Sequence, residues 1–258
     1  ALVAEAVSRL RADVAGSGAA DADAVIEAIF ENLEAKQALL SELEQKMKPG
    51  ALLTSNTSSI PLEQIASALQ FPGRLVGLHF FNPVAKMPLI EVIRFTGSDD
   101  ASANHAVGFA RQIGKLPLLC QSSPGFLVNR VLGPYLDEAM RLYNEGVTAE
   151  TIDRAARNFG MPMGPIELAD SVGLDIGLHV AEGLAAITGR EVPEALRTMV
   201  ANEQLGRKTG QGFYRYENGK TQRQPLPSAA IDPEVETRLV YALLNESANC
   251  LSEGVVST

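Results

Sequence analysis

The sequence predicts an α/β layer followed by a helical domain. Up to about residue 122, short apolar runs alternate with helical patterns and are separated by short turns. After Ser123-Pro124-Gly125 the apolar residues recur three and four apart, and no strand signal returns for a long stretch. Because alternating strands and helices form βα units, we expect a mostly parallel sheet in residues 1–122 and a helical domain in residues 123–216.

Each element of the first part follows from its local pattern. Apolar and β-branched runs predict strands at residues 23–30, 51–55, 74–79, 89–95 and 116–121. Helical spacing predicts helices at residues 1–10, 32–48, 61–71 and 101–113, with Pro49-Gly50, Pro72-Gly73 and Gly114 as stop signals. We expect Ser58 or Ser59 to cap the third of these helices, with Pro61 in its first turn.

The second part reads as a series of helices. Helical spacing covers residues 126–143, 148–158, 165–171, 174–187 and 193–202, and Thr148 is a predicted N-cap. A glycine-rich turn at residues 206–214 leads into a short extended tail. Residues 217–258 are predicted to be a polar linker followed by the start of a second helical repeat.

This repeat is visible as six residues that return in order 108 positions later, without a gap. We expect a second copy of the long helix, with its apolar stripe packed against the first. Because the copy stops at Thr258 and the chain opens in a helical pattern without a cap, we expect a fragment at both ends. The matched pairs are Arg130 with Arg238, Leu136 with Leu244, Glu138 with Glu246, Glu145 with Glu253, Gly146 with Gly254 and Val147 with Val255.

Composition excludes several classes of function. A net charge of -9 and no cluster of Lys and Arg argue against a nucleic-acid partner, since such proteins need a basic face. No apolar run approaches the ~18 residues that a membrane span requires. Cys120 and Cys250 lack partners at metal-ligand spacing, so we expect no metal site and a reducing, cytoplasmic setting.

His79 is the candidate general base. It lies where an apolar strand ends, which is the edge at which open α/β sheets bind ligands. Glu91 lies between Ile90 and Val92, where a carboxylate needs a partner, and a neighbouring strand can bring it to the imidazole. Such a pair fixes the tautomer and stabilises the imidazolium. The alternative is a buried structural histidine with satisfied hydrogen bonds.

Two further polar groups are candidates for ligand contacts. Ser55-Asn56-Thr57-Ser58-Ser59 offers donors and acceptors at the end of a strand, although the same residues suit a turn and a helix cap equally well. Asn129 lies early on the long helix and can hydrogen-bond a substrate oxygen. Its alternative is an exposed position in the first helical turn.

Six motifs, in matching order over nearly the whole chain, resemble the 3-hydroxyacyl-CoA dehydrogenase family. They are SNTSS at 55–59, GLHFFNP at 77–83, LIEVI at 89–93, SPGFLVNR at 123–130, MPMGPIELAD at 161–170 and GRKTGQGFYRY at 206–216. The resemblance implies a Rossmann-type NAD-binding domain, here lacking its N-terminal part, and an all-α C-terminal dehydrogenase domain. Its implied reaction is the oxidation of a (3S)-3-hydroxyacyl-CoA to the 3-oxoacyl-CoA in fatty acid β-oxidation.

The resemblance also implies roles for individual residues. By motif, the catalytic histidine falls on His79, its partner on Glu91, and the substrate contacts on Ser58 and Asn129. The implied contacts to the nicotinamide side of NAD fall on Glu31, Lys36, Asn56 and Asn82. The partial repeat resembles the tandem helical domains of multifunctional β-oxidation enzymes, which implies either a homodimer or a complex with a thiolase.

One departure leaves alternatives open. The sequence has no GxGxxG turn, and the third glycine position after Gly16-Ser17-Gly18 holds Asp21. A dehydrogenase of another hydroxy substrate is one alternative. A catalytically inactive folding or dimerisation module is the other.

Overall fold

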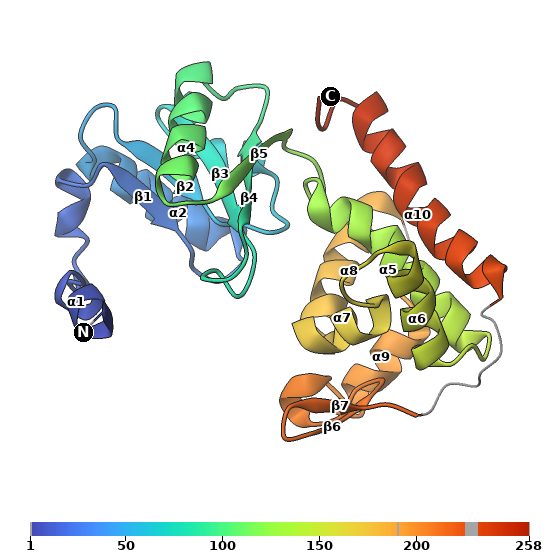
Figure 1. Cartoon of the computed structure of the whole chain (residues 1–258). Helices are drawn as coiled ribbons and strands as arrows, with labels where there is room; N and C mark the ends of the chain where they lie inside the picture. Colours follow the sequence, from blue (N-terminus) through green and yellow to red (C-terminus); the bar gives the residue numbers. More distant parts are fainter. Residues whose placement is uncertain (1, 190, 225–231, 258) are drawn as a thin grey trace. The chain divides into compact units, whose positions relative to one another are not determined.

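The computed structural model describes residues 2–189, 191–224 and 232–257. The chain forms two compact units, Ala1–Ser122 and Ser123–Thr258 (Figure 1). Residues 225–231 of the predicted linker, and Thr258, lie outside the described residues.

The first unit is built around a five-stranded sheet with the order β1-β2-β3-β4-β5. The β1, β2 and β3 strands run parallel, β4 is antiparallel to β3, and β5 is parallel to β4. This confirms the predicted α/β layer. Its elements are α1 (Leu2–Ser8), η1 (Ser17–Ala20), β1 (Ala24–Glu27), α2 (Leu33–Lys46), β2 (Leu52–Ser55), α3 (Leu62–Ala66), η2 (Pro72–Arg74), β3 (Leu75–Phe80), β4 (Leu89–Arg94), α4 (Asp100–Gln112) and β5 (Leu116–Gln121).

The two faces of this sheet are covered differently because side chains alternate along each strand. Leu78 and Val92 belong to a buried cluster with Ala106 and Ala110 of α4. The other side of β3 faces α3, since a Cβ placed on Gly77 would lie 3.3 Å from a methyl of Leu62. His79 shares this second side with Gly77, because the two residues are two positions apart.

The predicted serine cap of α3 is wrong. Pro61 is the N-cap, without a side-chain hydrogen bond, and the helix begins at Leu62. The backbone amide of Ser59 and its hydroxyl both donate to Glu31 instead, at 2.9 and 3.1 Å. The hydroxyl that receives the Leu62 amide comes from Ser122, at 3.2 Å. Both serines thus precede the helix, which begins only at Leu62, and their backbone amides bind a carboxylate distant in sequence.

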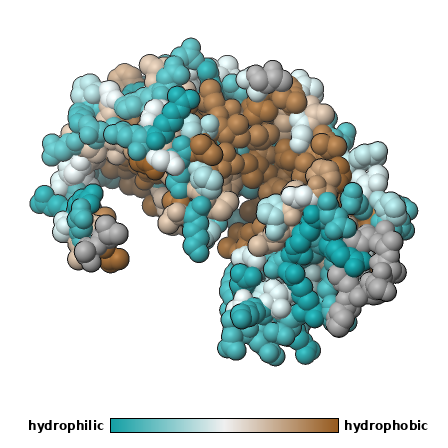
Figure 2. Space-filling view, in the orientation of Figure 1, coloured by the Kyte–Doolittle hydropathy of each residue, from teal (hydrophilic) through white to brown (hydrophobic). Residues whose placement is uncertain are grey.

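The second unit is mostly helical, as predicted. Thr148 caps α6 (Ala149–Phe159) by accepting from the backbone amide of Thr151 at 3.3 Å. The hairpin formed by Arg215–Glu217 and Lys220–Gln222 is hydrophilic on the face shown in Figure 2. The elements are α5 (Val128–Asn144), α6 (Ala149–Phe159), α7 (Pro165–Val172), α8 (Leu174–Thr188), α9 (Glu194–Ala201), η3 (Arg207–Thr209), β6 (Arg215–Glu217), β7 (Lys220–Gln222) and α10 (Pro233–Ser252).

Two buried aspartates hold this unit together. Asp153 accepts from the backbone amides of Ile166 and Glu167, at 2.8 and 3.1 Å, and so satisfies the first turn of α7. Asp170 accepts from the backbone amide of Tyr214 at 2.9 Å. Burial raises the pKa of Asp153 to about 6, although these amide donors act in the opposite direction.

The approach of the glycine-rich turn to Asp170 is too close for side chains. A Cβ on Gly206 would lie 2.3 Å from the backbone oxygen of Asp170, and one on Gly212 would lie 2.1 Å from its carboxylate. These distances account for Gly206 and Gly212, two of the three glycines in the 206–216 motif. The motif therefore has an architectural role in this unit.

Helix α10 packs against α5, and their ion pairs are reciprocal (Figure 1). Arg130 of α5 pairs with Glu246 at 2.8 Å and with Glu253 at 2.7 Å. The repeat-related Arg238 of α10 pairs with Glu138 and Glu145, each at 2.5 Å. Each arginine therefore binds the two glutamates of the other copy, which is the pattern of a local two-fold relation between the helices.

Candidate active site

His79 and Glu91 face each other across the antiparallel β3 and β4 strands. They are direct partners in the strand register, and Nδ1 of His79 lies 2.7 Å from Oε2 of Glu91. His79 is 5% exposed and Glu91 is fully buried. The contact expected from the sequence is therefore present.

This geometry sets the proton positions in the pair. An ionised carboxylate can only accept, so Nδ1 donates and the neutral imidazole keeps its acceptor lone pair on Nε2. When Nε2 takes up a proton, the buried carboxylate stabilises the positive charge at short range. The pair can thus act as a general base whose tautomer is fixed.

The strand around His79 is closely packed. Gly77 opposes Ile93 in the register, and a Cβ on Gly77 would lie 2.9 Å from two carbons of Ile93. The imidazole also makes an edge contact with Phe81, with ring centroids 4.7 Å apart. These contacts restrict how the imidazole can move.

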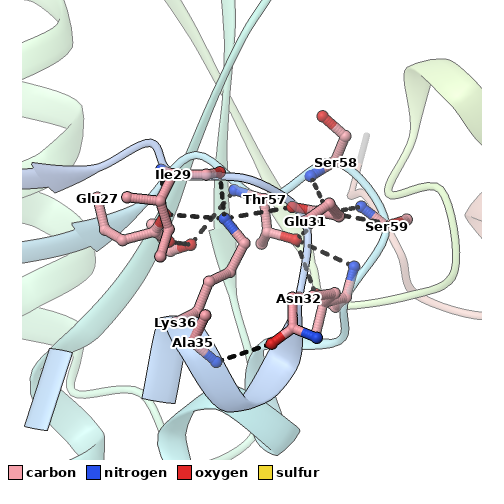
Figure 3. A network of polar contacts seen from close by, with 11 residues as sticks. Glu27, Ile29, Glu31, Asn32, Ala35, Lys36, Thr57, Ser58 and Ser59 are labelled. Atoms are coloured by element: carbon pink, nitrogen blue, oxygen red, sulfur yellow. Dashed lines mark hydrogen bonds and ion pairs between the residues drawn. The ribbon is translucent and has the colours of Figure 1, made fainter. Parts of the chain in front are cut away.

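A polar network lies at the ends of β1 and β2 (Figure 3). The ammonium of Lys36 lies 2.8 Å from Glu27 and 3.2 Å from Glu31. Glu31 accepts from the hydroxyl of Thr57 at 2.6 Å and from the backbone amides of Ser58 and Ser59, both at 2.9 Å. A single carboxylate therefore binds three consecutive residues of the loop after β2.

The hydrogen bonds to Glu31 determine its charge. Burial alone would raise the pKa of this carboxyl. The donors from Thr57, Ser58 and Ser59, together with the ammonium of Lys36, outweigh burial and lower the pKa to about 2. Glu31 is therefore ionised throughout the physiological range.

Asn56 connects the end of β2 to the end of β3. Its side-chain oxygen accepts from the backbone amide of Phe80 at 3.0 Å, and its own backbone amide donates to the carbonyl of Glu27 at 2.7 Å. The first bond fixes which way the side-chain amide points. Asn82 follows β3 and is exposed.

Comparison with protein families identifies both units. Residues 1–123 match the model of the 3-hydroxyacyl-CoA dehydrogenase NAD-binding domain, and residues 125–216 match that of the 3-hydroxyacyl-CoA dehydrogenase C-terminal domain. This chain belongs to the 3-hydroxyacyl-CoA dehydrogenase family. The resemblance seen in the six motifs is confirmed.

Individual relatives agree with this assignment. A fatty acid oxidation complex subunit alpha from Vibrio cholerae is 39% identical over 246 residues, which is 91% of this chain and 35% of the relative. The chain therefore spans about a third of the length of that relative. A 3-hydroxybutyryl-CoA dehydrogenase structure from Escherichia coli K12 is 38% identical, with a TM-score of 0.76, over 84% of this chain and 47% of the other. The dehydrogenase part of multifunctional enzyme 1 from C. elegans is 29% identical, with a TM-score of 0.70, over 99% of this chain and 62% of the other.

The predicted site residues of this chain are spread over both units. His79 and Glu91 meet on β3 and β4, and Asn129 is the second residue of α5, half-buried in the second unit. The loops at the ends of β1, β2 and β3 carry Glu31, Asn56, Ser58 and Asn82, while Lys36 lies in the first turn of α2.

These loops belong to the unit that matches the NAD-binding domain model. They lie at the carboxyl ends of three parallel strands, where open α/β sheets bind ligands, and they present an oriented amide on Asn56 and a charged carboxylate on Glu31. Lys36 differs from the others because its side chain is 1% exposed and its ammonium is bound within the network. Its predicted contact with the cofactor stays a prediction.

Sequence reasoning missed Glu27. It ends the apolar run of β1, is 2% exposed, and has a lysine nine positions later on the following helix. Like Glu91, Glu27 is a carboxylate in an apolar strand and needs a partner, and this signal was present in the sequence.

The described residues form neither a membrane-spanning helix nor a metal-binding cluster. No helix there has the length and apolar character needed to span a membrane. Within the same residues, no group of three or more His, Cys, Asp or Glu side chains is arranged to hold a metal ion.

Proposed function

We propose that the chain carries the site for oxidation of a (3S)-3-hydroxyacyl-CoA to a 3-oxoacyl-CoA with NAD, with His79 as general base. The observation that carries this proposal is the buried His79 and Glu91 pair, with 2.7 Å between Nδ1 and Oε2, in a chain of this family. NAD, when bound, supplies the acceptor for the hydride from C3 of the substrate.

The chain's own residues handle the proton. Nε2 of His79 accepts the proton of the 3-hydroxyl, and Nδ1 remains hydrogen-bonded to Glu91. The charge that forms on the imidazole is then shared with a fully buried carboxylate, which lowers the energy of the state that holds the proton. Glu91 does not itself need to take up the proton.

Ser58 and Asn129 are proposed substrate contacts, and Glu31, Asn56, Asn82 and Lys36 belong to the proposed cofactor side. Ser58 is supported by the anchoring of its backbone amide to Glu31 at 2.9 Å, which fixes the loop that carries its hydroxyl. Asn129 is supported by its position in the SPGFLVNR motif and by its partial burial.

Substitution of His79 by Gln in the full-length protein tests the base. We expect kcat for hydroxyacyl-CoA oxidation to fall by about 10²-fold or more, with substrate binding largely retained, because the variant keeps a polar side chain but has no basic nitrogen. His105→Gln is the matched control, since His105 is an exposed residue of α4 in the same unit. Near-normal turnover by His79→Gln would exclude the proposed base.

We propose the natural substrate range and assembly on the basis of the relatives. The name fatty acid oxidation complex subunit alpha, borne by several relatives, supports a role in a complex for fatty acid oxidation. From the family resemblance we propose an acyl-CoA substrate, a cytoplasmic setting and a complex with a thiolase, with a homodimer as the other assembly. Residues 217–258 would then be the linker and the start of a second helical repeat, as the reciprocal arginine pairs favour. Native mass measurement of the full-length protein, alone and with a thiolase, distinguishes these assemblies.

A further inference from the structure

The network at the ends of β1 and β2 contains a buried carboxylate, Glu27, that the proposed reaction does not use. We propose that Glu27 and Lys36 are positioning residues that hold Glu31, and through it the loop that carries Ser58. This inference rests on the proposed function for the role of Ser58, whereas the positioning itself can be measured without any reaction.

Glu27 is the fixed end of the network. One carboxylate oxygen accepts from Lys36 at 2.8 Å and from the backbone amide of Ile29 at 2.7 Å. The other accepts from the hydroxyl of Ser55 at 2.5 Å. The donors come from β2, from the loop after β1 and from α2, and Glu27 is only 2% exposed.

Lys36 links Glu27 to Glu31. Its stem comes from the first turns of α2, and its ammonium lies within 3.2 Å of Glu27, of Glu31 and of the backbone carbonyl of Ile29. Three acceptors match the three protons of an ammonium. Because the side chain is 1% exposed, a direct contact with a bound molecule would require the ammonium to leave these acceptors.

Glu31 connects the network to the loop that carries Ser58. Its outer oxygen accepts from Thr57, Ser58 and Ser59, while its inner oxygen faces the ammonium of Lys36. Its side chain is 22% exposed, so this is the boundary between the buried charges and the surface. The hydroxyl of Ser58 points away from the network (Figure 3). The network thus binds the backbone of the loop and leaves the Ser58 hydroxyl directed elsewhere.

The balance of charge explains why Glu27 matters. One ammonium lies between two carboxylates, of which one is buried and the other is partly exposed. If Glu27 becomes neutral, the attraction of Glu31 is no longer opposed, and the ammonium moves outward toward the exposed carboxylate. Glu31 then shifts relative to the amides of Ser58 and Ser59, and the loop loses its defined position.

The first experiment measures amide hydrogen exchange in the full-length protein without ligands. We expect Glu27→Gln to accelerate exchange at the amides of Ser58 and Ser59 by about ten-fold, because their acceptor is displaced. Glu44→Gln is the matched control. Glu44 is also a buried glutamate of this unit, and it accepts from the amides of Gln70 and Phe71 at 2.8 and 2.9 Å.

The two variants should accelerate amide exchange at different residues. Glu44→Gln should accelerate exchange at Gln70 and Phe71 and leave Ser58 and Ser59 unchanged. Unchanged exchange at Ser58 and Ser59 in Glu27→Gln would overturn the positioning role. A uniform acceleration throughout the unit, equal in the two variants, would also overturn it, since that result indicates only lower stability.

The second experiment asks whether Glu27 acts through Ser58. We expect Glu27→Gln to lower kcat/KM for hydroxyacyl-CoA by about ten-fold. In the Ser58→Ala background the same change should have no further effect, because the group that it positions is gone. Glu44→Gln should leave kcat/KM unchanged. The link to Ser58 would be overturned if the fold-losses in kcat/KM of the two single variants multiplied in the double variant. It would also be overturned if Glu27→Gln changed only the KM for NAD.

Lys36→Met provides a second test of the same connection, since it keeps the stem and removes the ammonium. It should accelerate exchange at Ser58 and Ser59 at least as much as Glu27→Gln does. Failure of the proposed function would look different: the unsubstituted protein would not oxidise hydroxyacyl-CoA, while the exchange pattern would still support or overturn the positioning role.

Discussion

Replacement of Glu91 by Gln isolates the contribution of the buried carboxylate to the His79 base. The variant keeps the size of the side chain and removes its charge. The bond that is changed joins a buried carboxylate to Nδ1 at 2.7 Å. A charge-assisted hydrogen bond of this kind contributes about 1.5–3 kcal/mol, which corresponds to about 10- to 100-fold in kcat.

A second effect adds to the first. The amide of Gln can present its N–H to Nδ1, which would place the imidazole proton on Nε2 and block the nitrogen that accepts the substrate proton. A reversed tautomer costs up to about 10⁴-fold in comparable pairs of histidine and carboxylate. The expected loss in kcat is therefore between 10- and 10⁴-fold, with the thermal midpoint little changed because a buried charge has been removed rather than created.

The assay combines steady-state turnover, followed by NADH absorbance, with nitrogen NMR of the His79 imidazole. The NMR shifts report directly which nitrogen carries the proton. Glu44→Gln serves again as the control for a buried glutamate that does not contact His79. A kcat within three-fold of the unsubstituted protein, with Nδ1 still protonated, would refute the assigned role of Glu91.

The helical unit yields two further predictions. Burial raises the pKa of Asp153 in the folded protein to about 6, above its unfolded value of 3.8. The folded state therefore binds this proton more tightly than the unfolded state, and the resulting stabilisation is lost as the pH rises from about 4 through 6. Denaturation between pH 4 and 7 should give Asp153→Asn a shallower decline in stability, by up to about 3 kcal/mol, and parallel curves would contradict this. Arg130→Met should lower the free energy of unfolding by about 2–3 kcal/mol, since Arg130 is 17% exposed and Glu246 only 7%. Arg238→Met should cost about 1 kcal/mol because its pairs are more exposed, and equal losses in chemical denaturation would contradict the difference.

Periodicity and turn residues predicted most of the fold because strands and helices here follow local rules. The β5 strand lies where its apolar run predicts it, and Thr148 caps α6 as its spacing indicates. The pairing of His79 with Glu91 was also accessible, since an isolated carboxylate in an apolar strand needs a nearby partner.

The remaining features depend on contacts between residues distant in sequence. Glu31 accepts from the amides of Ser58 and Ser59, which lie 27 and 28 positions away, and the helix expected to be capped by these serines begins only at Leu62. Asp153 and Tyr214 meet across 61 positions. No local pattern encodes such a partner, because either side chain would suit its own segment equally well with a different acceptor or donor.

The direct opposition of His79 and Glu91 has a consequence for errors in strand pairing. Successive side chains of a strand point to opposite faces, so a slip of β4 by one residue would place Ile90 or Val92 opposite the imidazole and turn Glu91 toward α4. The same slip would bring an ionised group into the apolar cluster around Leu78 and Ala106. The strand register that pairs His79 with Glu91 is thus also the one that keeps a charged group out of the apolar core, so misaligned pairings of β3 and β4 are disfavoured.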